Sequence, residues 1–84
     1  MRYIKDIPNN TYKMGLFQWN GKYIIKIEAA GRFEQIYKLD ETDFSGVEEL
    51  EAVLDKEMLS DVSSNFESMH RAIQSSLERN DVLI

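Results

Sequence analysis

The stretch that decides the fold is LFQWNGKYIIKIE, residues 16–28. In it, Asn20 and Gly21 separate two runs that are rich in aromatic and β-branched residues. A two-residue turn of type I′ needs a positive φ at both central positions, and an Asn-Gly pair adopts this conformation readily. The stretch therefore predicts a β-hairpin with Asn20 and Gly21 at its tip.

A two-residue turn also fixes which residues lie opposite each other, so that Leu16 faces Ile25 and Phe17 faces Ile24. Side chains alternate between the two faces of a strand, which sorts the hairpin into two sets. We expect the apolar set to face the core: Tyr12, Met14, Leu16, Tyr23, Ile25, Ile27 and Ala29. The opposite face is charged at one end and aromatic at the other: Lys13, Glu28, Lys26, Phe17, Ile24, Trp19 and Lys22.

Further strands are expected on either side of the hairpin. A three-residue loop, Ala30 to Arg32, would place Phe33, Tyr37 and Leu39 of FEQIYKL on the core face and Ile36 on the opposite face. We prefer it to a two-residue loop, which would bury Glu34 and Lys38 and so carry the cost of burying charge. YIKDI, residues 3–7, reads as a short strand that ends before Pro8, and the sequence leaves its pairing partner open.

The periodicity becomes helical after Asp40. SGVE, residues 45–48, has the pattern of a capping box in which Ser45 and Glu48 satisfy free backbone amides. Apolar residues then recur every three or four positions: Val47, Leu50, Leu54, Met58, Val62, Phe66, Met69, Ile73 and Leu77. The apolar stripe drifts after Met58, which predicts either one kinked helix or two helices. The break is expected between Asp55 and Asp61, with Ser60 as a candidate cap of the second helix.

These elements predict one α+β domain, residues 1–84, built in two layers. An antiparallel meander of three to four strands is followed by one kinked or two consecutive helices, packed on one sheet face. The β half covers residues 1–39, a loop residues 40–44, and the helical half residues 45–80. We expect residues 81–84 to fray.

Composition limits the classes of function. The 84 residues carry a net charge of −5 and no cysteine, so disulfides and thiolate metal sites are excluded. Residues 1–38 carry a net +4 and residues 39–84 a net −9, which predicts either attraction between two layers or surfaces with different partners. No apolar run approaches the roughly 20 residues of a membrane span, and the first residues lack a signal-peptide pattern. We therefore expect a cytoplasmic protein without membrane contact.

Catalytic motifs are weak in this sequence. Glu67 and His70 have the spacing of one half-site of a di-metal bundle, but such sites need further inward-facing acids on other helices. The serines lack a Gly-x-Ser-x-Gly elbow, and the acidic run after Asp40 does not match a calcium loop. We predict no enzyme activity, no metal and no cofactor, with His70 on the rim of the helical stripe.

The predicted interaction surface is the face opposite the core. It is formed by Phe17, Trp19, Ile24 and Ile36 with Lys22, Lys26 and Lys38 around them. Apolar surface with a polar rim is typical of protein interfaces, so we expect a homo-oligomer or another protein as partner. Single-stranded nucleic-acid binding is the alternative, because aromatic side chains stack on bases while lysines follow the backbone; the acidic composition speaks against it. A third interpretation is that these are half-exposed residues covered only by lysine stems.

Three stretches, FQWNGKYIIKIE, FEQIYKL and GVEELEAVL, resemble a family of short bacterial proteins without an assigned function. The resemblance spans roughly Tyr12 to Ile73 and implies no catalytic residue. The order of strands followed by a long helix is also similar to that of PUR-type and positive-cofactor-4-type domains, which bind single-stranded DNA. That similarity concerns the fold alone and implies nucleic acid on the sheet face.

Overall fold

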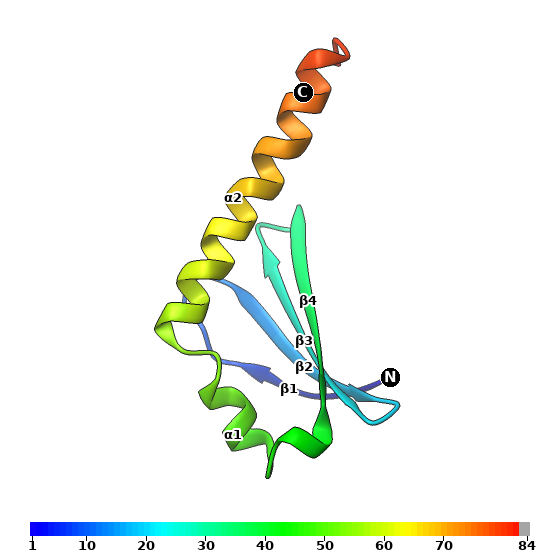
Figure 1. The fold of residues 1–84 in the computed structure, drawn as a ribbon, viewed down its shortest axis with the longest axis vertical. Coiled ribbons are helices and arrows are strands. Elements are labelled where there is room, and N and C mark those ends of the chain that lie inside the picture. The colour runs from blue at the N-terminus through cyan, green and yellow to red at the C-terminus, as the bar shows by residue number, and fades with distance from the viewer. Residues whose placement is uncertain (83–84) are drawn as a thin grey trace.

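The computed structural model describes residues 1–82 and shows a four-stranded antiparallel sheet with helices on one of its faces (Figure 1). The strands lie in the order of the chain: β1 (Arg2–Ile7), β2 (Lys13–Trp19), β3 (Lys22–Ala29) and β4 (Phe33–Asp40). They are followed by the 3-10 helix η1 (Glu41–Asp43), α1 (Val47–Ala52) and α2 (Lys56–Arg79). The predicted two-layer α+β architecture is confirmed, with four strands and two helices.

The predicted registers are also confirmed. Asn20 and Gly21 have φ angles of 55° and 76°, as a type I′ turn requires, and β2 pairs with β3 from Trp19–Lys22 to Lys13–Glu28. β3 and β4 are joined by the three residues 30–32, with the Arg32 N–H donating to the Ala29 carbonyl at 3.1 Å. This register sends the alternate apolar residues of β4 into the core, as expected: Phe33, Tyr37 and Leu39.

The pairing of β1, which the sequence left open, is with β2. A β-bulge at Ile4 interrupts this pairing, because Tyr3 lies opposite Phe17 while Lys5 lies opposite Leu16. The extra residue changes the face on which the following side chains lie. Ile4 packs against the core, and the Lys5 ammonium reaches the Glu51 carboxylate of α1 at 2.8 Å. Tyr3 is consequently turned to the side of the sheet away from the helices.

The core lies between the sheet and the two helices. Its buried residues come from β1, β2, β3, the two helices and the link between these helices: Ile7, Met14, Leu16, Ile25, Ile27, Leu50, Leu54, Val62 and Phe66. Polar contacts between the β half of the chain and α2 lie beside this core. The Tyr12 hydroxyl hydrogen-bonds with Ser63, and the Gln35 side-chain amide donates to the Val62 carbonyl at 3.0 Å. The sheet therefore holds α2 by packing and by hydrogen bonds to its first half.

Both predicted helix caps are wrong. The Ser45 N–H donates to the Glu49 carboxylate at 3.1 Å instead of forming a box with Glu48, because α1 begins one residue later than expected, after Gly46. α2 begins after Asp55, whose carboxylate accepts from the Met58 N–H at 2.9 Å. Ser60 consequently lies inside the helix, where no free backbone amide needs it.

Helix α2 is longer than the sheet that it covers. Its 24 residues span about 36 Å at 1.5 Å per residue, whereas the eight residues of β3 span about 26 Å. Figure 1 shows the second half of α2 continuing past the β3–β4 turn. The radius of gyration is 15.2 Å, against about 12 Å for a compact domain of this length. The apolar stripe of α2 therefore continues beyond the part that packs on the sheet.

The tail that we expect to fray begins at Asp81. The Val82 N–H donates to the Leu77 carbonyl at 2.9 Å, and Asp81 takes a left-handed φ of 56°, which together close the helix end. Residues 83–84 lie outside the described residues.

Candidate interaction surface

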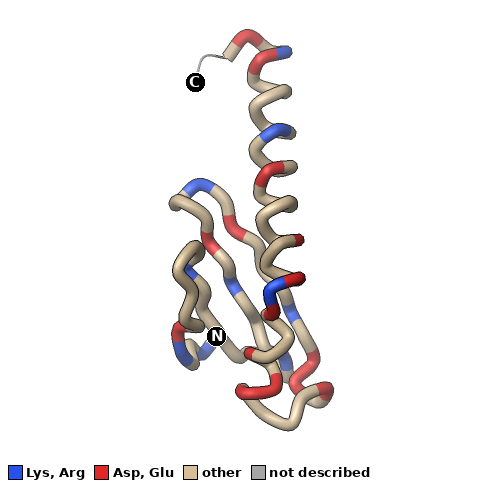
Figure 2. Tube along the Cα trace, turned by 90° about the vertical axis from the view of Figure 1, so that its left-hand side faces the viewer, with Lys and Arg blue, Asp and Glu red and all other residues tan. Residues whose placement is uncertain are grey.

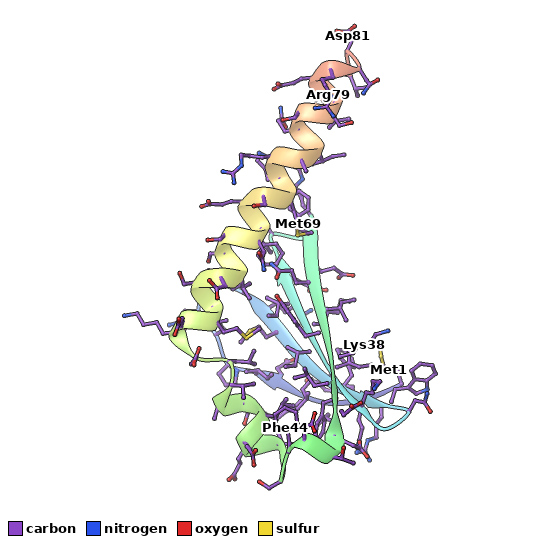
Figure 3. The ribbon with its side chains drawn as sticks, in the orientation of Figure 1. Met1, Lys38, Phe44, Met69, Arg79 and Asp81 are labelled. Carbon is purple, nitrogen blue, oxygen red and sulfur yellow. The ribbon has the colours of Figure 1, made fainter. Side chains whose placement is uncertain are left out.

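The sheet face that points away from α1 and α2 is called the open face. No other element covers it within residues 1–82 (Figure 1). The strand registers place these side chains on it: Tyr3, Asp6, Lys13, Phe17, Trp19, Lys22, Ile24, Lys26, Glu28, Glu34, Ile36, Lys38 and Asp40. Figure 3 shows Met1 and Lys38 on this side of the sheet. All seven residues of the sequence-predicted surface thus belong to one face.

Apolar side chains gather at the middle of the open face. Trp19 is 58% exposed, Tyr3 54% and Ile36 51%, whereas Ile24 between them is only 5% exposed. Ile24 forms the floor of a hollow of about 270 Å³, whose apolar lining also includes Met1, Phe17, Trp19 and Ile36. Ile24 therefore supports the surface from below, and its neighbours supply the exposed area.

Two aromatic contacts organise the β1–β2 side of the open face. Phe17 meets Tyr3 edge to face, with ring centres 5.6 Å apart at 62°. On its other side the Phe17 ring lies against Gly15, where a side chain would crowd it. A glycine at this strand position leaves room for the ring to lie flat on the sheet, and Phe17 is half-buried as a result.

Charges on the open face are balanced. Four lysines (Lys13, Lys22, Lys26 and Lys38) share it with four acids (Asp6, Glu28, Glu34 and Asp40). Lys26 lies between Glu28 at 3.2 Å and Glu34 at 3.4 Å, and hydrogen bonds to these two carboxylates raise its pKa. Lys22 forms an ion pair with Asp40. The four lysines therefore bring little unbalanced positive charge to this surface.

Met1 and Tyr3 are contributors that sequence reasoning missed. Strict alternation along β1 would put Tyr3 on the same side as Ile7, which is buried in the core. The bulge at Ile4 reverses this placement, and no residue in YIKDI marks it. Only the pairing of Tyr3 with Phe17 reveals the position, and that pairing depends on tertiary structure.

The most acidic segment of the chain lies mainly outside the open face. Figure 2 shows acidic positions grouped in the segment that runs from the end of β4 through α1 into the start of α2. Residues 40–61 hold nine acids and a single lysine, Lys56. The two halves of the chain therefore differ in charge mainly because the helical layer carries an acidic outer surface.

A second hollow lies where α2 leaves the sheet. The β3–β4 turn and α2 enclose a groove of about 440 Å³, lined by Ala29, Ala30, Arg32, Phe33, Phe66, Glu67, His70 and Arg71. The exposed His70 ring meets Phe33 edge-on at 6.2 Å, which agrees with the expected rim position. Among residues 1–82, no group of three His, Asp or Glu side chains is placed to hold a metal ion.

No protein-family model, curated protein or solved structure matches this chain. Both resemblances drawn from the sequence therefore stay predictions. In the part of the chain that the structure describes, no helix combines the length and the apolar character that crossing a membrane requires.

Proposed function

We propose that this chain is a non-enzymatic interaction module that associates with a second copy of itself through the open face. The observation that carries the proposal is the cluster of Trp19, Tyr3 and Ile36, each more than half exposed around the buried Ile24. Contiguous apolar surface with a polar rim marks interaction sites in soluble proteins. Tryptophan and tyrosine are also the residues that contribute most often to the energetic centre of an interface.

The charge balance of the open face favours a protein partner. Two sheets pack face to face about 10 Å apart, with their inner side chains interdigitated. A second copy brings the same four lysines and four acids, so its approach meets no net repulsion. Lys26 and Lys22 are already paired with acids of their own chain, which leaves the centre of the face free for apolar contact.

Single-stranded nucleic-acid binding remains the alternative prediction for the same surface. It needs lysines that neutralise phosphates, and the ion pairs of Lys22 and Lys26 reduce the charge available for this. The alternative predicts that an oligothymidylate quenches Trp19 fluorescence at low salt and that added salt reverses the quenching. Quenching of this kind, without any change in protein mass, would favour nucleic acid over a second copy.

The test compares a double variant and a single variant with the wild type by light scattering over a wide range of protein concentration. Trp19→Ser with Ile36→Ser removes the exposed centre of the open face without touching the core. Val53→Ser, at a residue 42% exposed just after α1, is the matched control away from the face. We expect the double variant to have a lower mass than the wild type and the control to keep the wild-type mass. A double variant with unchanged mass and unchanged circular dichroism would refute self-association through this face.

A further inference from the structure

The end of α2 carries an apolar stripe that the sheet does not reach. Residues 69–82 are called the α2 extension. Met69, Ile73 and Leu77 continue the spacing of the core residues Val62 and Phe66, yet Ile73 is 42% exposed. Figure 3 shows Arg79 and Asp81 far beyond Met69, which lies level with the end of the sheet. Within residues 1–82, Ile73 is not among the hydrophobic residues that pack against the core, whereas Met69 is.

The α2 extension is a regular helix as far as Arg79 and is closed by a turn over residues 80–82. The Asn80 N–H and side-chain amide donate to the Ser76 carbonyl at 3.1 and 2.8 Å, and the Val82 N–H reaches the Leu77 carbonyl. Short helices without tertiary contacts are only marginally stable in water, and most helical stability in proteins comes from packing of an apolar face. The apolar face beyond Met69 would therefore gain stability by packing on another surface.

The groove at the base of the α2 extension is the second half of this feature. Its floor is apolar, with Phe33 and Phe66 as the largest members. Its rim is mostly basic, because Arg32 and Arg71 lie on it with Glu67 as the single acid. The opposite end of the extension carries two acids and one arginine: Glu78, Arg79 and Asp81.

We propose that the α2 extensions of two copies pair antiparallel, so that the end of each lies over the groove of the other. Pairing about Ile73 brings position 80 of one helix level with position 66 of its partner, and 14 residues span the required distance of about 20 Å. Glu78 and Asp81 then arrive near Arg32 and Arg71. Parallel pairing would instead place Arg71 level with Arg71 and Glu78 level with Glu78.

A second copy fits the α2 extension better than a charged partner does. The segment 69–82 holds two arginines and two acids, and therefore has no net charge in a chain that is acidic overall. Every copy carries both the stripe and the groove, so a two-fold pairing covers both at once. This interface does not depend on the open face, because the two surfaces share no residue.

The first experiment measures mass for four proteins: the wild type, Trp19→Ser/Ile36→Ser, Ile73→Asp/Leu77→Asp, and all four changes together. If both interfaces form, the wild type exceeds a dimer, each double variant is a dimer, and the combined variant is a monomer. If only the α2 pairing forms, the open-face variant stays a dimer and the helix variant is a monomer. If only the open face associates, these two results are exchanged, and the α2 proposal is refuted.

A charge control separates the stripe from the helix in general. Ser68→Asp/Ser75→Asp adds the same two charges to exposed positions on the outer side of α2. We expect this variant to dimerise like the wild type, and Ile73→Asp/Leu77→Asp to dimerise at least ten-fold more weakly. If the two double variants weakened dimerisation equally, the contact could not be assigned to the apolar stripe.

The second experiment determines the direction of pairing. The chain has no cysteine, so single cysteines can be introduced without interference. In an antiparallel pair about Ile73, positions 70 and 77 of different copies lie within one residue, about 1.5 Å, of the same level. We expect a mixture of His70→Cys and Leu77→Cys proteins to form a mixed disulfide dimer faster than either protein forms a dimer alone. Faster self-dimerisation of each single variant would show parallel pairing and overturn the proposal.

Discussion

The Phe17 ring lies so close to Gly15 that a Cβ at position 15 would come within 3.1 Å of the ring carbon Cε1. Replacing Gly15 with alanine should therefore displace the ring and destabilise the protein by roughly 1 kcal/mol. In a Phe17→Leu background the same change should be stabilising, because glycine in a strand costs about 0.5–1 kcal/mol relative to alanine. Urea denaturation of the wild type, the two single variants and the double variant measures how strongly the effects of the changes at positions 15 and 17 on stability depend on each other. If Gly15→Ala changed the free energy of unfolding in the same direction with Phe17 and with Leu at position 17, a steric contact between residues 15 and 17 would be contradicted.

The N-terminus of α2 depends on Asp55. Its carboxylate accepts the Met58 N–H, and an Asp→Ala change at such a cap costs about 1 kcal/mol. We expect Asp55→Ala to lower the free energy of unfolding by that amount. Ser60→Ala is the control, because Ser60 is exposed inside the helix and should change stability by less than about 0.5 kcal/mol. If Ser60→Ala lowered the free energy of unfolding more than Asp55→Ala, Ser60 would be the cap of α2, as expected from the sequence.

The pKa of Glu49 is lowered, first by the Ser45 hydroxyl and then by the Ser45 backbone N–H, which both donate to its carboxylate. A lowered pKa in the folded state stabilises the protein above the ordinary glutamate range, and this contribution disappears as the pH falls through the lowered pKa. Ser45→Ala should raise the pKa of Glu49 in an NMR titration, and the stability difference from wild type should vanish at acid pH. Glu48→Gln keeps the Ser45–Glu49 contact and is the control.

Leu50 in α1 and Ile73 in α2 belong to the same apolar pattern of the sequence, but truncating them to alanine should change stability by different amounts. Leu50 is fully buried between α1 and the sheet, so Leu50→Ala should cost about 2–5 kcal/mol at any protein concentration. Ile73→Ala should cost less than about 1 kcal/mol in dilute solution, where copies are separate. At high concentration its cost should grow, because association stabilises the folded state by mass action. Thermal denaturation at two protein concentrations distinguishes these cases.

Much of the sheet could be predicted because Asn20-Gly21 sets a register that the alternating residues then repeat. The face that β4 turns to the core was predicted from the cost of burying Glu34 and Lys38. The helix caps were harder to predict, because other side chains that can accept a hydrogen bond from a backbone N–H lie within one or two residues of Ser45 and Asp55. Local sequence does not show which of these side chains caps the helix. The Ile4 bulge has no local signal, since either face of β1 offers an apolar residue. The sequence also predicts the apolar stripe of the helices, but it does not predict how much of that stripe the sheet can cover.

The seven predicted surface residues share a face because alternation within one hairpin requires it. Their exposure could not be predicted, since the hollow around Ile24 is formed by Met1 together with side chains from β2, β3 and β4. The groove beside α2 was also beyond sequence reasoning. It joins Phe33 to Phe66, which lie in different elements and meet only when the layers pack.

The bulge at Ile4 also affects how sheets of different molecules could join. β1 and β4 are the outer strands, and a flat outer strand offers unpaired backbone groups on which another strand can add. An extra residue in β1 twists that border and interrupts its regular backbone spacing, while β4 carries charged side chains along its border. These features disfavour the addition of strands from other molecules at the sheet edges, so that molecules associate through side-chain surfaces instead. Deleting Ile4 would straighten the border, and the resulting protein should form thioflavin-positive fibrils more readily than the wild type.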